Sequence, residues 1–309
     1  MSKTVPTSVT LGTRGSPLAL LQTYDVRDRL IAANPGLTVE IAEITVVGDQ
    51  IQDRALAEVG GKGLFTKELD RAILDGRCDA AVHSMKDMPV DQPEGLVLDC
   101  YLPREDVRDA FVSLNHDSLA ALPEGAIVGT SSLRRRAQLA ARRPDLKVVE
   151  FRGNVQTRMR KLGDGVAEAT FLAMAGLRRL GMEEVVKSAL ATTDMLPAVA
   201  QGAIGIERRA DDSRAAAMLE AVHHGPTGER LAAERAFLEG LDGSCQTPIA
   251  GLAELDGGTL RLRGEILRPD GSEVLTDDRS VPVEDGAALG AEMARDLRQR
   301  AGPGFFDWH

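Results

Sequence analysis

The sequence has few of the features that mark membrane, secreted or metal-binding proteins. Its 309 residues include no apolar run near the roughly 20 residues that cross a bilayer, and the N-terminal segment lacks the apolar core of a signal peptide. The three cysteines, Cys78, Cys100 and Cys245, are widely spaced, so they predict neither a disulfide framework nor a zinc site. The five histidines show no metal-ligand spacing. We therefore expect a cytoplasmic protein with no metal and no membrane partner.

Aromatic residues are also scarce, and acidic residues outnumber basic ones. Aromatics form 3% of the chain and the formal net charge is −10. Both values argue against a nucleic-acid partner, because such proteins use basic faces and stacking rings. Residues 130–180, however, hold twelve Lys or Arg against four Asp or Glu, a local excess of +8 that leaves −18 for the rest. A basic segment in an acidic chain predicts a small polyanionic ligand.

The hydrophobic pattern predicts an α/β protein with mainly parallel sheets, because short apolar runs alternate with amphipathic segments. Expected strands cover residues 9–13, 37–47, 80–82, 96–101 and 204–207 in a first lobe, and 126–129, 148–151 and 169–172 in a second. From residue 249 the period changes to two, over 249–255, 259–267 and 272–279, which predicts an antiparallel meander with a covering helix over 285–300.

This pattern predicts three domains. Residues 1–102 and 200–222 form a discontinuous α/β lobe, and residues 106–196 form a second, Arg-rich α/β lobe. Residues 225–309 form a small α+β domain with a three-stranded antiparallel sheet. A chain of this length is sufficient for two or three separate cores.

One stretch, His83 to Pro89, follows a short apolar run that is typical of a central strand. Pro89 ends the strand, which places Lys86 and Asp87 in a tight turn at its carboxyl end. Ligands of open α/β sheets bind at this edge. A cation beside a carboxylate suits proton handling there, although a solvated turn without function explains the pair equally well.

Several helix starts follow strand ends in the same way. Ser16 and Pro17 form an N-cap and first-turn signal directly after Arg14, which predicts either a carboxylate site or an ordinary cap. In the second lobe, arginines follow three strand ends, and these are Arg134 and Arg135 after the Thr130–Ser132 hydroxyls, Arg152 and Arg158 around Gly153, and Arg179. Because the guanidinium fork matches carboxylates, this repetition predicts an anion site.

Two further segments remain open at this stage. Residues 48–63 are polar and glycine-rich, which is typical of a lid over a ligand edge or of a plain connection. Phe65 beyond it is either a core anchor or a ring that stacks on ligand.

Cys245 lies in a glycine-serine loop, where a thiolate is accessible, but no histidine is near it in sequence. Covalent attachment of a group, or no role, are the remaining alternatives for Cys245.

Taken together, these motifs closely resemble the hydroxymethylbilane synthase (porphobilinogen deaminase) family, whose fold has two lobes like those of periplasmic binding proteins and a small third domain. The resemblance runs in order from Thr10 to about Gly251. It rests on TRGSPLAL at Thr13, GGKGLF at Gly60, AVHSMKDMP at Ala81, GTSSLRRRAQL at Gly129, FRGNVQTR at Phe151, LAMAGLRRLG at Leu172, PAVAQGAIGIE at Pro197 and GSCQTPIAG at Gly243.

The resemblance implies a monomeric transferase of tetrapyrrole (haem) biosynthesis that joins four porphobilinogen molecules and releases linear hydroxymethylbilane. Cys245 then carries a dipyrromethane cofactor through a thioether, and Asp87 is the catalytic residue. The cofactor-binding positions are Ser84, Lys86, Thr130, Ser131, Ser132, Arg134, Arg135, Gly153 and Arg158. The substrate-binding positions are Arg14, Ser16, Lys62, Phe65, Arg152, Arg179 and Gln201.

The alternative is a two-lobed binding protein for a small polyanion, with the same fold but no catalysis. Such a protein has no need for Cys245 or Asp87, and both are present. A dipyrrole adduct on the purified chain separates the two interpretations.

Overall fold

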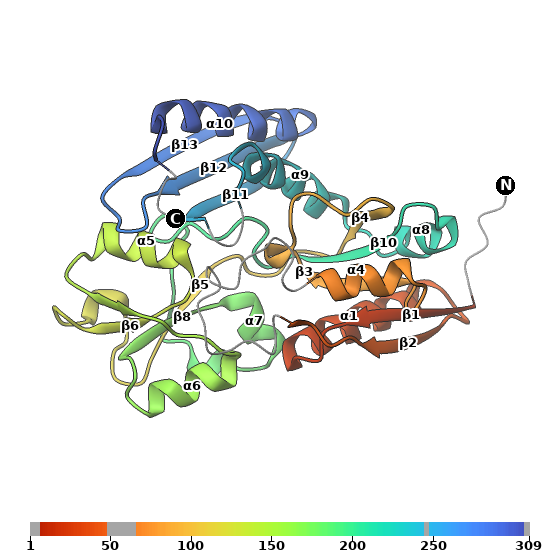
Figure 1. Cartoon of the computed structure of the whole chain (residues 1–309), viewed down its shortest axis with the longest axis horizontal. Helices are drawn as coiled ribbons and strands as arrows, with labels where there is room; N and C mark the ends of the chain where they lie inside the picture. Colours follow the sequence, from red (N-terminus) through yellow and green to blue (C-terminus); the bar gives the residue numbers. More distant parts are fainter. Residues whose placement is uncertain (1–6, 48–65, 244–246, 306–309) are drawn as a thin grey trace. The chain divides into compact units, whose positions relative to one another are not determined.

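The computed structural model describes residues 7–47, 66–243 and 247–305 (Figure 1). The described chain divides into two compact units. The first contains residues 7–47, 66–105 and 202–228, and the second contains residues 106–201, 229–243 and 247–305.

The first unit is built on a five-stranded sheet in the order β2-β1-β3-β10-β4. Its strands are β1 (Ser8–Thr13), β2 (Thr38–Glu43), β3 (Ala80–Ser84), β4 (Leu96–Tyr101) and β10 (Ile204–Arg209). Strand β1 runs parallel to β2 and β3, whereas β10 is antiparallel to both β3 and β4. The late strand β10 therefore inserts between two early ones.

Helices cover both faces of this sheet. They are α1 (Pro17–Ala33), α4 (Lys67–Leu74) and α8 (Ser213–Glu220). Side chains alternate across a strand. Val82 accordingly joins the core that contains residues of α1 and α8, and its neighbour Ala81 joins the core that contains residues of α4. Burial of β3 on both faces explains its continuous apolar run.

The second unit contains a five-stranded sheet in the order β7-β6-β8-β5-β9. Its strands are β5 (Asp109–Ser113), β6 (Ile127–Gly129), β7 (Lys147–Val149), β8 (Ala169–Ala173) and β9 (Ser188–Ala189). Strand β6 runs parallel to β7 and β8, and β5 is antiparallel to β8 and β9. The associated helices are α5 (Leu133–Arg142), α6 (Val155–Gly163) and α7 (Met174–Arg179).

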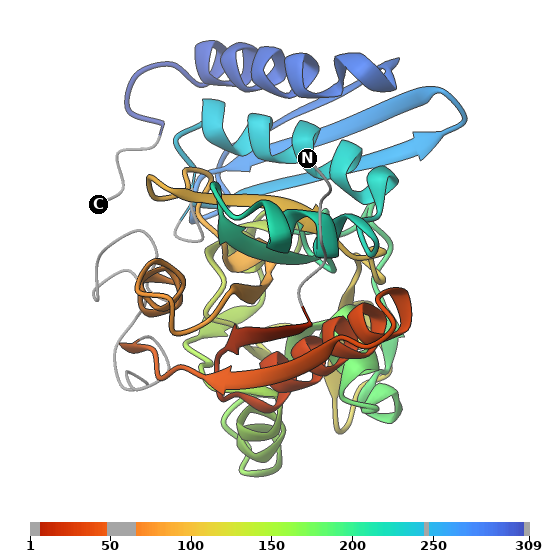
Figure 2. The ribbon, with the colours of Figure 1, turned by 90° about the vertical axis from the view of Figure 1, so that its right-hand side faces the viewer.

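The second unit also contains a three-stranded antiparallel sheet, β11 (Ile249–Asp256), β12 (Thr259–Leu267) and β13 (Val274–Pro282). Helices α9 (Gly225–Gly240) and α10 (Gly286–Ala301) accompany it (Figure 2). The two helices pack closely, since a side chain at Gly290 would collide with the Ala233 carbonyl oxygen. Phe237 of α9 lies against Gly264 of β12, so alternate residues of β12, including Glu265, face away from α9.

Short 3₁₀ segments complete the described chain, at η1 (Met85–Asp87), η2 (Leu119–Ala121), η3 (Glu183–Val185) and η4 (Val283–Asp285). Within the described ranges, no helix combines the length and the apolar character that crossing a membrane requires.

The predicted fold class is confirmed, with two α/β lobes of mainly parallel strands and a small α+β part. The sequence pattern does not predict β5 or β9, and β2 is shorter than the expected 37–47. Strand β5 is easily missed because it begins with a charged residue, Asp109, directly after a highly charged segment. The division into three domains at residues 1–102 with 200–222, 106–196 and 225–309 stays a prediction.

Candidate functional site

The carboxyl end of β3 forms a pocket in the first unit. As predicted, the chain leaves β3 in the tight η1 turn, where Lys86 is exposed and Asp87 is half-buried. The pocket is a shallow depression that is open to solvent. Its lining residues are Arg14, Ala19, Gln22, Thr66, Val82, His83, Ser84, Asp87 and Met88. The pocket therefore brings together three candidate residues from two separate motifs, Arg14, Ser84 and Asp87.

The start of α1 is ordered by its own side chains. Ser16 is the N-cap, and its Oγ accepts a hydrogen bond from Ala19 N at 3.3 Å, with Pro17 in the first turn. Gln22, one turn further, lies with its Nε2 and Oε1 at 2.9 and 3.0 Å from Ser84 Oγ. This pair of contacts fixes the wall of the pocket between α1 and β3.

A buried acidic cluster lies at the same pocket. Glu207 of β10 is fully buried, and its Oε2 is 3.3 Å from Nε2 of His83, which lines the pocket. Burial, and then the carboxyl group of Glu207, raise the pKa of Asp70 to about 6, against the smaller opposing effects of His83 and Thr66. Ionising both of these interacting carboxyl groups is unfavourable, because two buried negative charges repel one another. No sequence motif points to this cluster.

We expect Asp70→Asn to change how stability depends on pH. A pKa raised from 3.8 to about 6 in the fold means that the folded state holds this proton more tightly. The free energy of unfolding of the parent should therefore fall as the pH rises from about 4 to about 6, by up to about 3 kcal/mol. Asn cannot lose a proton, so the variant should lack this fall.

Thermal unfolding between pH 4 and pH 7 measures the difference. Asp75→Asn, at an exposed carboxylate just beyond α4, is the matched control and should follow the parent. If the melting temperatures of Asp70→Asn and the parent change in parallel with pH, the pKa of Asp70 is not raised in the folded state and the prediction is wrong.

The turn before α5 uses all three of its hydroxyl groups. Thr130 Oγ1 accepts a hydrogen bond from Ser132 N at 3.2 Å, and Ser132 Oγ accepts one from Arg135 N at 3.4 Å. Ser131 Oγ accepts one from Phe151 N at 3.1 Å, which joins the turn to the second residue after β7. These bonds hold the N-terminus of α5 in place at the edge of the sheet.

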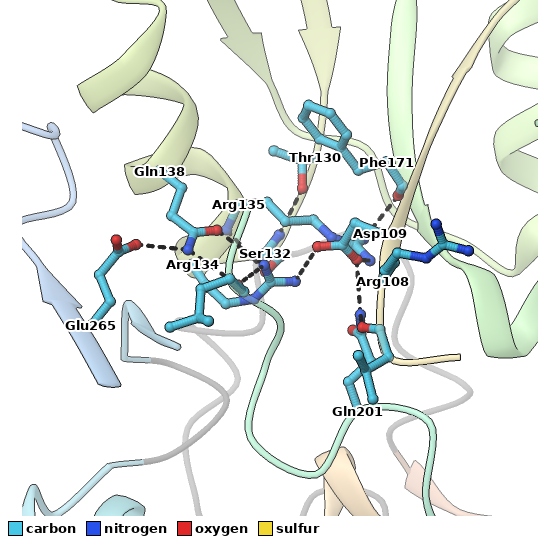
Figure 3. A network of polar contacts seen from close by, with 12 residues as sticks. Arg108, Asp109, Thr130, Ser132, Arg134, Arg135, Gln138, Phe171, Gln201 and Glu265 are labelled. Carbon is cyan, nitrogen blue, oxygen red and sulfur yellow. Dashed lines mark hydrogen bonds and ion pairs between the residues drawn. The ribbon is translucent and has the colours of Figure 1, made fainter. Parts of the chain in front are cut away.

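Arg134 and Arg135 point inward from this helix start (Figure 3). They are only 4% and 6% exposed, and both donate to Asp109 of β5, Arg134 Nη2 to Oδ2 at 2.8 Å and Arg135 Nη2 to Oδ1 at 2.6 Å. Burial by itself would raise the pKa of Asp109, but the two guanidinium groups hold it well below its usual range. Gln201 Nε2 donates to Asp109 Oδ1 at 3.0 Å. The sequence predicted both arginines but not their buried partner.

A second group of arginines follows β7. Gly153 has φ of +117°, and a Cβ there would lie 2.5 Å from Thr157 Cγ2, so this turn requires glycine. Arg158 Nε donates to the Gly153 carbonyl at 2.9 Å. Burial, with the nearby charges of Arg135 and Arg152, lowers the pKa of Arg158 to about 10, although Glu150 opposes the shift. Arg152 Nη1 is buried and has no hydrogen-bond partner in the described part.

The remaining predicted residues fall into two sets. Arg179 is half-buried at the end of α7, and it too has a polar or electrostatic interaction in the structure. Lys62, Phe65 and Cys245 lie outside the described residues. Within the described ranges, no group of three His, Cys, Asp or Glu side chains is arranged to hold a metal ion.

Comparison with known families places nearly the whole chain. Residues 9–217 match the family described as porphobilinogen deaminase, dipyromethane cofactor binding domain, and residues 229–299 match the porphobilinogen deaminase C-terminal domain. The porphobilinogen deaminase of Paracoccus denitrificans (strain Pd 1222) is 64% identical over 303 residues, covering 97% of this chain and 96% of that protein. The chloroplastic porphobilinogen deaminase of Pisum sativum is 52% identical over 307 residues, covering 97% and 83%.

Among solved structures, the methionine-binding protein MetQ is similar at 14% identity and a TM-score of 0.44, over 72% of this chain and 91% of that one. This similarity is too low to support a conclusion about a ligand. The family matches and the sequence identities of 64% and 52% are much higher than this 14% identity. They cover both the sheet-edge motifs and the C-terminal sheet. The chain therefore belongs to the porphobilinogen deaminase family.

Proposed function

We propose that this chain is a hydroxymethylbilane synthase. It is a transferase that joins four porphobilinogen molecules head to tail on a covalently held dipyrromethane, with loss of one ammonia each, and releases linear hydroxymethylbilane by hydrolysis. The observation that carries the proposal is the match of residues 9–217 to the family's dipyrromethane-binding domain, in a chain that keeps Asp87 in a pocket beside Arg14.

The second unit has the donors that this cofactor needs. A dipyrromethane built from porphobilinogen bears acetate and propionate groups, so its site has to supply cations. Among the buried guanidinium atoms without a hydrogen-bond partner in the described part, Arg134 Nε, Arg135 Nε and Arg152 Nη1 belong to the predicted cofactor-binding or substrate-binding arginines, and Arg208 Nε and Arg263 Nε do not. Burial, and after it the nearby charges of Arg135 and Arg152, lower the pKa of Arg158, so other cations lie close to this one. An anion in this region would satisfy unpaired donors, so the residues present fit the group.

Cofactor binding is assigned to Thr130, Ser131, Ser132, Arg134, Arg135, Gly153 and Arg158 in the second unit, to Ser84 and Lys86 in the first, and to a thioether at Cys245. When bound, the dipyrromethane supplies the pyrrole carbon to which the first substrate unit is joined. The other two cysteines support this assignment. Burial raises the pKa of Cys78 to about 11 and that of Cys100 to about 12, so neither readily forms the reactive thiolate.

Asp87 acts on the substrate in this proposal. Loss of the amine from porphobilinogen leaves a developing positive charge on its ring. A carboxylate at the pocket wall stabilises that charge, accepts a hydrogen bond from the pyrrole N–H and can pass a proton during amine loss. Half-burial of Asp87 strengthens such interactions, because the surrounding dielectric constant is lower than that of water.

Substrate binding is assigned to Arg14, Ser16, Lys62, Phe65, Arg152, Arg179 and Gln201. Arg14 lines the pocket with Asp87, so it can hold a substrate carboxylate there. Ser16 supports Arg14 indirectly by capping α1. Gln201 donates to the Val107 carbonyl at 2.8 Å and to Asp109, so it contributes by holding the arginine network. We further propose a cytoplasmic monomer with no nucleic-acid or membrane partner.

Product stoichiometry tests the proposal against a polyanion-binding protein without catalysis. Incubation with porphobilinogen should consume four molecules and release four of ammonia for each linear tetrapyrrole formed, over many turnovers. A binding protein would retain porphobilinogen unchanged and release no ammonia. Binding without ammonia release, by protein that is folded in a thermal scan, would refute the synthase assignment.

A further inference from the structure

Asp109 is a single buried carboxylate that holds two cations. It is fully buried at the start of β5, and both of its oxygens are used. Oδ2 accepts from Arg134, while Oδ1 accepts from Arg135 and Gln201. Two adjacent guanidinium groups repel one another in a medium of low dielectric constant, and burial lowers the pKa of Arg134. Asp109 offsets that repulsion and leaves the cluster with one net positive charge.

Backbone carbonyl groups complete the orientation of both side chains. Arg134 Nη1 donates to the Leu196 carbonyl at 2.9 Å, and Arg135 Nη1 donates to the Phe171 carbonyl at 2.8 Å. Each guanidinium is therefore fixed by at least two bonds at its Nη end. The Nε of each arginine is buried and has no hydrogen-bond partner in the described part. The network thus holds two cations in fixed positions and leaves the Nε–H of each without a partner in the described part.

The same network continues to the C-terminal sheet (Figure 3). Arg134 Nη1 donates to Gln138 Oε1 at 3.1 Å, and Gln138 Nε2 donates to Glu265 Oε1 of β12 at 2.7 Å. Glu265 Oε2 accepts from Arg142 Nη2 at 2.8 Å. Glu265 is 4% exposed and lies on the face of β12 away from α9. The sheet that follows Cys245 in the chain is therefore bonded to the helix that carries both arginines.

We propose that Asp109 is a positioning residue that fixes Arg134 and Arg135 for the carboxylates of the dipyrromethane, and that Glu265 acts on Arg134 through Gln138. This inference rests on the proposed function, because it assigns a task to the cofactor-binding arginines. A purely structural role for Asp109 predicts a different result. Loss of Asp109 would then lower stability, and the variant would attach cofactor as fast as any other variant of the same stability.

The test measures cofactor attachment to full-length apo-protein from cells that lack porphobilinogen. Porphobilinogen is added and the fraction of chains with a dipyrrole adduct is followed by intact mass, well below the melting temperature. Asp109→Asn keeps the shape but removes the charge, and it should attach cofactor roughly tenfold more slowly or worse, because displaced cations hold the carboxylates poorly. Val112→Ala, at a fully buried position on β5, is the destabilised control that keeps Asp109, and it should attach cofactor at the parent rate.

The attachment rate of Asp109→Asn, compared with that of Val112→Ala, decides whether the inference holds. Attachment by Asp109→Asn at the rate of Val112→Ala would overturn the inference, as would faster attachment, which would mean that net positive charge alone governs binding. If the parent itself gains no adduct, the proposed function fails instead.

A second pair of variants tests the Glu265 part of the inference, whether or not Asp109→Asn folds. Gln138→Glu places two carboxylates together at Glu265 and should slow attachment. Adding Glu265→Gln restores one donor and one acceptor at that contact, so the double variant should recover most of the parent rate. Parent-like attachment in Gln138→Glu alone, or no recovery in the folded double variant, would contradict the role given to Glu265.

Discussion

The Cys245→Ala variant should fold, with a melting temperature below that of the cofactor-loaded parent because it lacks the bound anion, and should have essentially no synthase activity. The expected loss is large because the proposed thioether has no substitute. Cys78 is 2% exposed, as is Cys100, and burial raises the pKa of both thiols. A buried thiol with a high pKa neither meets the substrate nor reacts as a thiolate. The rate of porphobilinogen consumption, with a thermal scan of the same sample, measures the effect.

Cys78→Ala is the matched control for this experiment. It removes a thiol from the first unit at a position that lies beneath the sheet in the core with Leu69 and Ile73. We expect a modest loss of stability and a nearly normal rate. Near-normal activity in Cys245→Ala would exclude a covalent primer at Cys245.

The Asp87→Asn variant should bind porphobilinogen almost normally and turn it over about 10²–10⁴ times more slowly. Asn is nearly the same size, so the η1 turn and the pocket should keep their shape. It cannot, however, supply the negative charge that stabilises a cation developing in the transition state. The loss should therefore appear in kcat more than in KM. Steady-state kinetics of purified, fully loaded enzyme measures both constants.

Asp91→Asn provides the comparison, because Asp91 is an exposed carboxylate four residues further along the chain. It should retain the parent's kcat. An Asp87→Asn variant whose turnover stays within about threefold of the parent would show that Asp87 is not the catalytic residue, since the expected effect is at least ~10²-fold.

Local signals allowed much of the fold to be predicted. Ser16 and Pro17 mark the start of α1, and the period of two after residue 249 marks the C-terminal meander, because both depend on neighbouring residues only. Strand β5 depends on its surroundings instead. Asp109 contradicts the pattern of a buried strand until its partners Arg134 and Arg135 are known. The strand is stable there because the two guanidinium groups neutralise its first residue.

Some residues of the candidate site could likewise be predicted from local sequence, and others could not. Sequence motifs identified the arginines and the Lys86–Asp87 turn, since these follow strand ends directly. They could not identify Glu265, whose partner Gln138 is 127 residues away in the chain, nor the pairing of Asp70 with Glu207 across two elements. Asp109 and Glu207 each border an apolar run and lie next to other charged residues, so nothing in the local pattern marks either of them as buried. Lys62, Phe65 and Cys245 stay predictions from sequence.

The mass of the intact chain tests the covalent primer most directly. Protein purified from cells that make porphobilinogen should be heavier than its sequence by one dipyrrole adduct, and a short substrate pulse should add further pyrrole units in single steps. Cys78→Ala should keep the adduct, and Cys245→Ala should have the mass of the bare chain. A parent chain that carries no adduct and gains none from porphobilinogen, or an adduct that persists in Cys245→Ala, would contradict the account.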